Sequence, residues 1–221
     1  MPASYAGTQV FNLSTGNVVD SNTGKITTPD TNLTFTVSSR SSCRTYEAAF
    51  FAFDGNLYSK YCDNTQPIVP NVITLHYQNA EVSPVQLILT SAGDSSIFQG
   101  RNVQSWRLYG SNNGSSWNLI KDNTYPWFLI PIDDVTNYEP VTFLDNNNYF
   151  SYLKFEVYET VASDADAVQF SELKINGDYR NLCPFKGNSA NANNFIGSIK
   201  SNSPASTKSN GAGSCQNAVT R

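Results

Sequence analysis

The fold of this chain is decided around one stretch, Phe50-Phe51-Ala52-Phe53-Asp54-Gly55-Asn56-Leu57-Tyr58-Ser59-Lys60-Tyr61. An apolar run leads into the turn Asp54-Gly55-Asn56, where glycine supplies free backbone geometry and its neighbours supply side-chain oxygens. Ser59 adds a hydroxyl, and Ca²⁺ requires such oxygens, since it takes about six to eight of them as ligands. The stretch therefore suggests a calcium site. An ordinary Asp-Gly turn between two core segments is the simpler alternative.

The composition is that of an extracellular β protein. A length of 221 residues suits one large all-β domain, or a domain with an appendage. Apolar residues (39%) and aromatic residues (13%) suffice for a core, while only 14% of residues are charged. The net charge is −4 and the 14 Lys and Arg are scattered, which argues against nucleic acid or anionic lipid as a partner. No run of about 18 apolar residues is present, so we expect no transmembrane segment.

Four cysteines favour an exported protein with disulfides. No CxxC motif occurs and there is a single His, so a zinc site is not expected. Of the three pairings that four cysteines allow, we expect Cys43–Cys62 and Cys183–Cys215, because each pair lies within one local segment.

Sequons at Asn12, Asn32 and Asn113 predict glycosylation and also favour export. Residues 1–7 carry no signal pattern, so either a leader has been removed or the chain is not secreted. The four cysteines favour the first alternative, a protein that is secreted or displayed on the cell surface.

Short segments of alternating polarity predict strands along most of the chain. The clearest are residues 33–37, 71–77, 85–90, 105–110, 117–120, 152–158 and 168–175, with edge strands at Val10-Phe11 and Val18-Val19. Asn113-Gly114 predicts a hairpin, and Trp106 and Trp117 on its strands are expected in the core. No helix of ordinary length is expected, and the many short strands favour a jelly-roll β-sandwich.

Composition divides the chain into three parts. Residues 1–30 form a polar N-terminal segment, residues 31–178 the sandwich, and residues 179–221 a Ser/Asn-rich tail that we expect Cys183–Cys215 to close.

The last predicted strand is irregular at Glu172. The apolar parity of residues 168–175 flips between Phe170 and Leu173. A β-bulge there would re-aim the Glu172 carboxylate. The alternative is a strand buried on both faces with a peripheral glutamate.

Three segments resemble the discoidin family, which includes coagulation factor V/VIII type C domains and family 32 carbohydrate-binding modules. They are Ala52-Phe53-Asp54-Gly55-Asn56…Ser59-Lys60-Tyr61, then Arg101…Ser105-Trp106-Arg107-Leu108-Tyr109-Gly110-Ser111-Asn112-Asn113-Gly114…Trp117, then Val168-Gln169-Phe170-Ser171-Glu172-Leu173-Lys174-Ile175. The resemblance covers about residues 30–178 and implies a galactose-binding-domain-like sandwich. It also implies that the first and third segments meet around one structural calcium ion. The ligands would be the Ala52 carbonyl and the side chains of Asp54, Asn56, Ser59 and Glu172.

The resemblance further implies ligand binding by loops at one end of the sandwich. Sugar-binding members use an arginine where Arg101 stands and a histidine where this chain has Cys62, so galactose specificity loses support. We expect Tyr58, Asp94 and Trp127 to contribute instead. Aromatic rings stack on the apolar face of a pyranose, while carboxylate and guanidinium groups bind its hydroxyls. For Trp127, partial burial in the core is the alternative.

The parts of familiar catalytic sites are missing. There is no G-x-S-x-G motif, the single histidine, His76, falls on a strand face, and the cysteines are expected in disulfides. Asp133-Asp134 and Asp164/Asp166 fit solvated loop acids better than a general-acid pair.

We therefore expect a non-catalytic, lectin-like or cell-adhesion module that binds glycans or the glycoproteins of cell surface and matrix. The alternative is a structural subunit of an extracellular matrix or filament that self-associates.

Overall fold

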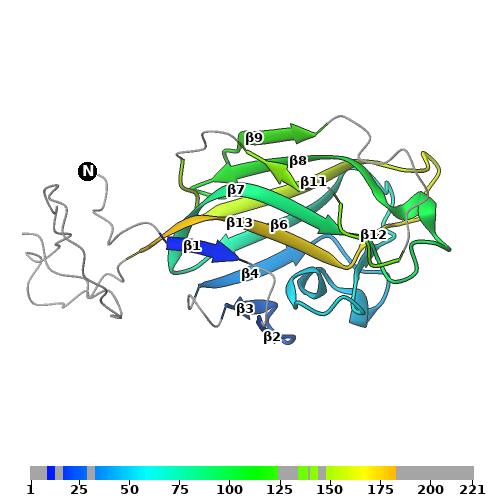
Figure 1. Ribbon diagram of the computed structural model, residues 1–221, viewed down its shortest axis with the longest axis horizontal. Helices are drawn as coiled ribbons and strands as arrows, with labels where there is room; N and C mark the ends of the chain where they lie inside the picture. Colours follow the sequence, from blue (N-terminus) through cyan, green and yellow to red (C-terminus); the bar gives the residue numbers. More distant parts are fainter. Residues whose placement is uncertain are drawn as a thin grey trace, which may run out of the picture.

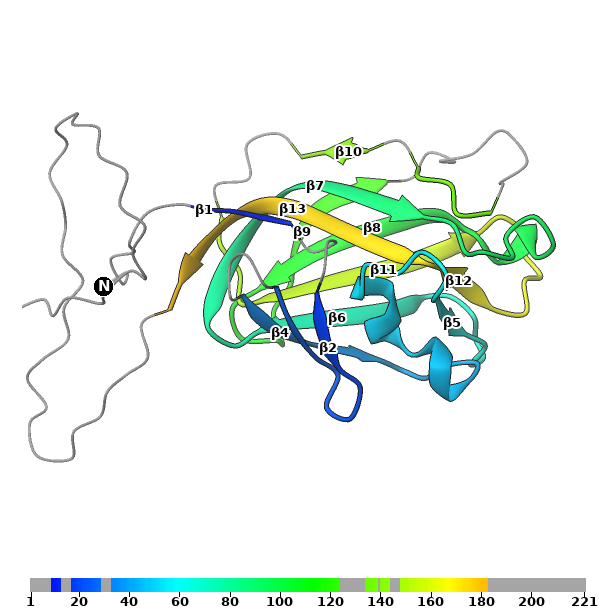
Figure 2. The ribbon, with the colours of Figure 1, turned by 60° about the horizontal axis from the view of Figure 1, so that its bottom comes forward.

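Two antiparallel β-sheets form a sandwich in the computed structural model (Figures 1 and 2). The structure describes residues 9–12, 17–28, 33–123, 134–138, 140–143 and 148–182. Within them the helical elements are three short 3₁₀ turns, η1 (Thr45–Glu47), η2 (Ala49–Phe53) and η3 (Gln99–Arg101). The predicted all-β sandwich is confirmed. No helix of this described part is long and apolar enough to cross a membrane.

The larger sheet has seven strands. In spatial order they are β2 (Val18–Asp20), β3 (Lys25–Thr27), β4 (Thr34–Ser39), β6 (Asn71–Tyr77), β11 (Tyr152–Thr160), β8 (Val103–Ser111) and β9 (Asn118–Asn123). The smaller sheet has the order β1 (Gln9–Asn12), β13 (Glu172–Asn181), β7 (Ala80–Thr90) and β10 (Val141–Thr142). A separate pair, β5 (Tyr61–Asp63) with β12 (Val168–Phe170), lies at one end of the sandwich (Figure 2).

Alternating burial explains why these segments are strands. In β6, every second residue is buried, so one face packs in the core and the other faces outward. Trp106 is fully buried, as predicted, and its ring lies 5.6 Å from that of Phe155. Phe155 in turn contacts Phe170, with ring centroids 6.0 Å apart. Aromatic packing thus connects β8 and β11 to the end pair β5/β12.

The prediction that Trp117 is a core residue is wrong. Trp117 has the same parity as Leu119 of the edge strand β9, which is 53% exposed, so its ring lies on the outer face. The Lys154 ammonium lies 5.1 Å from the centre of the Trp117 ring. The half-buried indole therefore covers a lysine on the neighbouring surface rather than filling the core.

The predicted hairpin joins β8 to β9, but through a turn longer than two residues. Gly114 adopts a φ of 69°, a left-handed conformation that favours glycine. Asn113 instead uses its side chain, whose Oδ1 accepts hydrogen bonds from the amides of Ser115 (2.9 Å) and Ser116 (2.8 Å). The Asn-Gly pair therefore stabilises the turn by two different mechanisms.

The irregularity predicted at Glu172 is a change of sheet rather than a bulge. The chain leaves β12 at Phe170 and enters β13 at Glu172. Between them, the Ser171 amide donates to the Thr90 carbonyl (2.9 Å) and the Ser171 hydroxyl donates to the Ser91 carbonyl (2.9 Å). The parity flips because the two halves of the segment pack in different sheets.

Replacing Gly110 by Ala tests the packing between β8 and the loop that precedes β11. A Cβ at Gly110 would lie 2.4 Å from ring atoms of Phe150, so the ring or the strand must move. We expect Gly110→Ala to lower the free energy of unfolding by about 1–3 kcal/mol, measured by urea denaturation. Gly93→Ala is the control, because its Cβ would meet only Val135 Cγ2, at an ordinary 3.8 Å. Equal stability of the two variants would contradict this packing.

Candidate functional site

The structure brings the turn Asp54-Gly55-Asn56 and Glu172 together. The 3₁₀ turn η2 buries Ala52 and Phe53 and delivers the chain into the turn, where Gly55 has a φ of 76°. The Gly55 amide donates to Glu172 Oε1 at 3.1 Å. The Ser59 hydroxyl donates to Asp54 Oδ2 at 2.8 Å, which closes the turn on itself.

Glu172 is a buried carboxyl group whose close charged neighbour is another carboxyl group, that of Asp54. It is fully buried, and its Oε2 has no hydrogen-bond partner among the described residues. Burial, followed by hydrogen bonding and charge repulsion from Asp54, raises the pKa of Glu172 to about 9. Two carboxylates this close, one of them buried, are costly unless a proton or a metal cation lies between them.

These residues fit the calcium ion that the sequence predicts. Asp54 and Glu172 would supply hard carboxylate oxygens from two distant parts of the chain, and the Ser59 hydroxyl lies against Asp54. The Asn56 side chain is turned toward its own loop, where its Oδ1 accepts from the Tyr58 amide at 3.1 Å. The ion would be structural, joining the start of β13 to the turn, and it stays a prediction.

Calcium should stabilise the protein increasingly as the pH rises. Without the ion, Glu172 keeps its proton in the folded state up to a pKa of about 9, whereas the unfolded chain loses it near 4.5. Stability is therefore lost as the pH rises between these values, and a bound cation that holds Glu172 ionised removes this loss. We expect CaCl₂ to raise the melting temperature relative to EDTA, and by more at about pH 8 than at about pH 5.

Glu172→Gln is the matched variant for this experiment. It keeps the shape of the side chain but removes the charge that would bind the ion, so its melting temperature should be insensitive to calcium. A wild-type melting temperature that is the same in calcium and in EDTA would refute the metal site.

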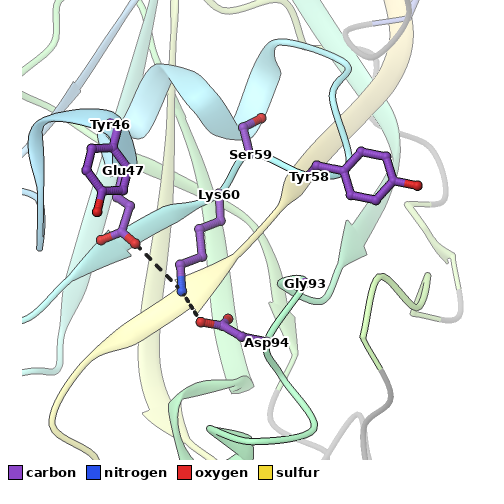
Figure 3. Close-up of a pocket in the computed structure, with 7 residues that line it drawn as sticks. All are labelled: Tyr46, Glu47, Tyr58, Ser59, Lys60, Gly93 and Asp94. Carbon is purple, nitrogen blue, oxygen red and sulfur yellow. Dashed lines mark hydrogen bonds and ion pairs between the residues drawn. The ribbon is translucent and has the colours of Figure 1, made fainter.

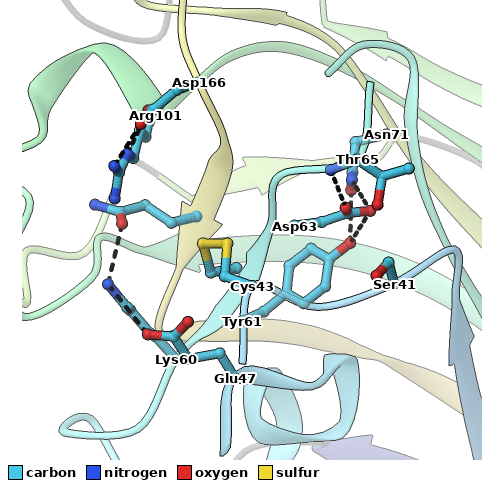
Figure 4. Close-up of a disulfide and its surroundings, with 12 residues drawn as sticks. Ser41, Cys43, Glu47, Lys60, Tyr61, Asp63, Thr65, Asn71, Arg101 and Asp166 are labelled. Atoms are coloured by element: carbon cyan, nitrogen blue, oxygen red, sulfur yellow. Dashed lines mark hydrogen bonds and ion pairs between the residues drawn. A yellow bond between two sulfur atoms is a disulfide. The ribbon is translucent and has the colours of Figure 1, made fainter. Parts of the chain in front are cut away.

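The predicted disulfide Cys43–Cys62 is present and spans 19 residues (Figure 4). The Cys43 amide also donates to the Cys62 carbonyl at 2.8 Å. The bridge thus joins the segment before η1 to β5, and Cys62 is almost fully buried. Cys183 and Cys215 lie outside the described residues, so their pairing stays a prediction.

Removing this disulfide should destabilise the protein measurably. Closing a loop of this length is worth roughly 3 kcal/mol, so Cys43→Ser/Cys62→Ser should lower the free energy of unfolding by about that amount. Urea denaturation in oxidising buffer measures the loss. The stability of wild-type protein in reductant should approach that of the double variant. An unchanged urea midpoint for both the double variant and the reduced wild-type protein would contradict this prediction.

Figure 3 shows a pocket of about 300 Å³. It lies close to the disulfide, because a carboxylate oxygen of its lining residue Glu47 is within 4.8 Å of both sulfur atoms. Two exposed tyrosines, Tyr46 (56%) and Tyr58 (93%), lie at its sides, and Lys60 lies between Glu47 and Asp94. Two small residues, Ser59 and Gly93, complete the lining. The residues that line the pocket are Tyr46, Glu47, Tyr58, Ser59, Lys60, Gly93 and Asp94. The pocket therefore combines aromatic walls with a polar floor, an arrangement suited to a ligand with one apolar face and several hydroxyl groups.

Two of the predicted ligand-binding residues, Tyr58 and Asp94, line this pocket. Arg101 does not line it, because it makes a bidentate ion pair with Asp166 at 2.6 and 2.7 Å (Figure 4). Its guanidinium also lies 3.9 Å from the ring centre of Phe98. The hydrogen bond with Asp166 raises the pKa of Arg101. Trp127 lies outside the described residues.

Besides Gly93, which has no side chain, the sequence analysis missed three residues of the lining, Tyr46, Glu47 and Lys60. Lys60 stands in the first family-like segment, yet nothing local distinguishes it from a solvated surface lysine. Its role depends on Asp94, which lies 34 positions away.

The predicted glycosylation sites are placed only in part. Asn113 is exposed in the β8–β9 turn and Asn12 ends β1, while Asn32 lies outside the described residues. Glycosylation at all three stays a prediction.

Comparison with solved structures identifies the fold. A family 32 carbohydrate-binding module from Clostridium perfringens NanJ, solved with galactose, matches with a TM-score of 0.50 at 17% identity. The match covers 64% of this chain and 93% of that one. The chain has the fold of the family 32 carbohydrate-binding modules. The predicted discoidin-like, galactose-binding-like architecture is thereby confirmed.

Two further modules of this fold from C. perfringens match equally well. One, solved with GalNAc-β-1,3-galactose, has a TM-score of 0.50 at 17% identity, over 64% of this chain and 94% of that one. The other, from a family 31 glycoside hydrolase, has a TM-score of 0.50 at 16% identity, over 73% of this chain and 95% of that one. No protein-family model and no curated protein matches the sequence. The family 32 fold therefore rests on structure, and the function must be argued from the site.

Proposed function

We propose that the protein is a non-catalytic carbohydrate-binding module that binds glycans in the pocket between Tyr46 and Tyr58. The observation that carries the proposal is the Tyr58 ring, which is 93% exposed at the edge of a polar pocket. A large aromatic ring held in water beside hydrogen-bonding groups is the usual means of binding a pyranose, whose apolar face stacks on the ring. Asp94 and Glu47 supply acceptors for the hydroxyl groups.

The comparisons support the same class of ligand. The two similar modules solved with ligands hold galactose and GalNAc-β-1,3-galactose. At position 62, where the family resemblance expects a ligand-binding histidine, this chain has a buried disulfide cysteine. We therefore propose glycan binding with contacts specific to this chain, and no preference for galactose.

The polar groups of the pocket support binding rather than catalysis. Both carboxylates that line it, Glu47 and Asp94, are paired with Lys60, at 3.7 and 2.5 Å. These ion pairs direct both carboxylates toward Lys60, whereas a general acid in glycoside hydrolysis must face the oxygen of the leaving group. Neither carboxylate is arranged for that role.

An extracellular location and a structural calcium ion complete the proposal. The disulfide Cys43–Cys62 persists only in an oxidising environment, such as the outside of the cell. Glycans or glycoproteins of the cell surface or matrix are the partners of suitable chemistry. The alternative of a self-associating matrix or filament subunit rested on the polar terminal segments, most of which lie outside the described residues.

Substitution of Tyr58 tests the proposal directly. We expect wild-type protein to bind sugars on a glycan array, and Tyr58→Ala to weaken the binding of the best ligand by roughly tenfold in calorimetry. Tyr109→Ala is the control, because Tyr109 lies on the outer face of the seven-stranded sheet, where it contacts Lys154. The control should keep wild-type affinity. An array without hits, or equal loss in both variants, would refute the proposed site.

A further inference from the structure

The floor of the pocket holds one cation between two carboxylates. Lys60 Nζ lies 2.5 Å from Asp94 Oδ2 and 3.7 Å from Glu47 Oε1 (Figure 3). The Lys60 side chain is only 16% exposed, compared with 11% for Glu47 and 31% for Asp94. Solvent therefore screens these three charges less than it would at an open surface. A ligand that enters the pocket is exposed to the charges of Lys60, Glu47 and Asp94.

The Lys60 ammonium is already occupied by protein oxygens. Besides Asp94, it donates to Gln169 Oε1 at 3.1 Å, from a glutamine that is fully buried in β12. The orientation of this amide follows from chemistry, because an ammonium group has only donors and the amide oxygen alone can accept from it. With Glu47 as third neighbour, the three N–H groups of Lys60 face two hydrogen-bond acceptors and one ion-pair partner. An acidic ligand would have to displace one of them.

No other cation of the described residues lines the pocket. Arg101 is bound by both oxygens of Asp166 and lies outside the lining. The lining therefore has one positive group, Lys60, against two negative groups, Glu47 and Asp94, a formal charge of −1. From outside the lining, Arg44 contacts the Tyr46 ring, and both Arg44 and Arg101 interact electrostatically with Glu47. A carboxylate or sulfate that enters the pocket still meets the two carboxylates of the lining itself, and like charges repel strongly at short range.

We propose that the Lys60–Asp94 ion pair determines the specificity of the glycan site, so that it selects uncharged sugars and rejects sugars that carry a carboxylate or sulfate. The inference rests on the proposed function, since it specifies which glycans the same pocket takes. Lys60 acts as a positioning residue: it neutralises one oxygen of Asp94 and fixes the buried Gln169. The Asp94 side chain stays 31% exposed, so its carboxylate is an acceptor that a sugar hydroxyl can meet in the pocket.

Sugar pairs that differ only at C6 test this selectivity in the full chain. Galactose with galacturonic acid, and glucose with glucuronic acid, are titrated by calorimetry or by ligand-observed NMR at low ionic strength. We expect wild-type protein to favour the hexose of at least one pair by about tenfold or more. The preference should shrink when salt is added, because it is electrostatic.

Two variants should move the preference in opposite directions. Asp94→Asn keeps the shape of the side chain but leaves Lys60 with one carboxylate fewer, so the hexose-to-uronate ratio should fall by roughly tenfold. Lys60→Met removes the cation and should raise the ratio above that of wild type. Lys25→Met, on the exposed strand β3, changes the net charge equally but should leave the ratio unchanged.

The outcomes separate this inference from the proposed function. If wild-type protein binds no sugar and Tyr58→Ala changes nothing, both fail. If sugars bind in a Tyr58-dependent manner but uronates bind as tightly as hexoses, or Asp94→Asn leaves the ratio unchanged, only the inference is overturned. Thermal melting identifies a variant that does not fold. If Lys60→Met is one, the Asp94→Asn ratio and the wild-type salt dependence decide the question.

Discussion

The Gly55 amide and the Glu172 carboxyl group, 117 positions apart in sequence, make the hydrogen bond on which the pocket-bearing end of the sandwich depends. One partner closes a tight turn after η2, and the other is the first residue of β13. Because β13 is central in the four-stranded sheet, the turn is fixed to the most extensively paired strand of that sheet. This contact fixes the direction in which residues 58–61 leave the turn. Three of those residues, Tyr58, Ser59 and Lys60, line the pocket.

The short sheet β5/β12 transmits this constraint to the pocket. Gln169 of β12 is paired in register with Cys62 of β5, two positions after Lys60, which the Gln169 side chain binds. The Cys43–Cys62 disulfide then joins this sheet to the segment that carries η1 and Glu47. The pocket is thus surrounded by covalent, backbone and ionic connections, although its residues come from loops. Such connections restrain the backbone around the pocket, and a site that is already ordered loses less conformational entropy on binding.

Local patterns in the sequence predicted the strands well, because each strand shows its burial in its own alternation of polar and apolar residues. They also predicted the turn at Asp54 and the pairing of Cys43 with Cys62, both of which are local. The errors have long-range causes. Trp117 looked like a core residue, but β9 is an edge strand whose outward parity it shares. The parity flip at Glu172 looked like a bulge, because the sequence does not show that Ser171 separates strands of two different sheets.

The candidate site was only partly predictable for the same reason. Tyr58 and Asp94 could be selected by residue type, and the structure places both in one pocket. Arg101 had the right chemistry, but its bidentate partner Asp166 lies 65 positions further along the chain. The role of Lys60 could not be predicted, since it is defined by three oxygen atoms from three separate segments.

Amide hydrogen exchange in wild-type protein and Glu172→Ala tests the central claim most directly. If the Gly55–Glu172 contact holds the functional end in place, exchange should accelerate at residues 54–63 and 168–172, while the central strands β6 and β11 keep their protection. Unchanged exchange at Gly55 and throughout β5, or equal acceleration across both sheets, would contradict the account.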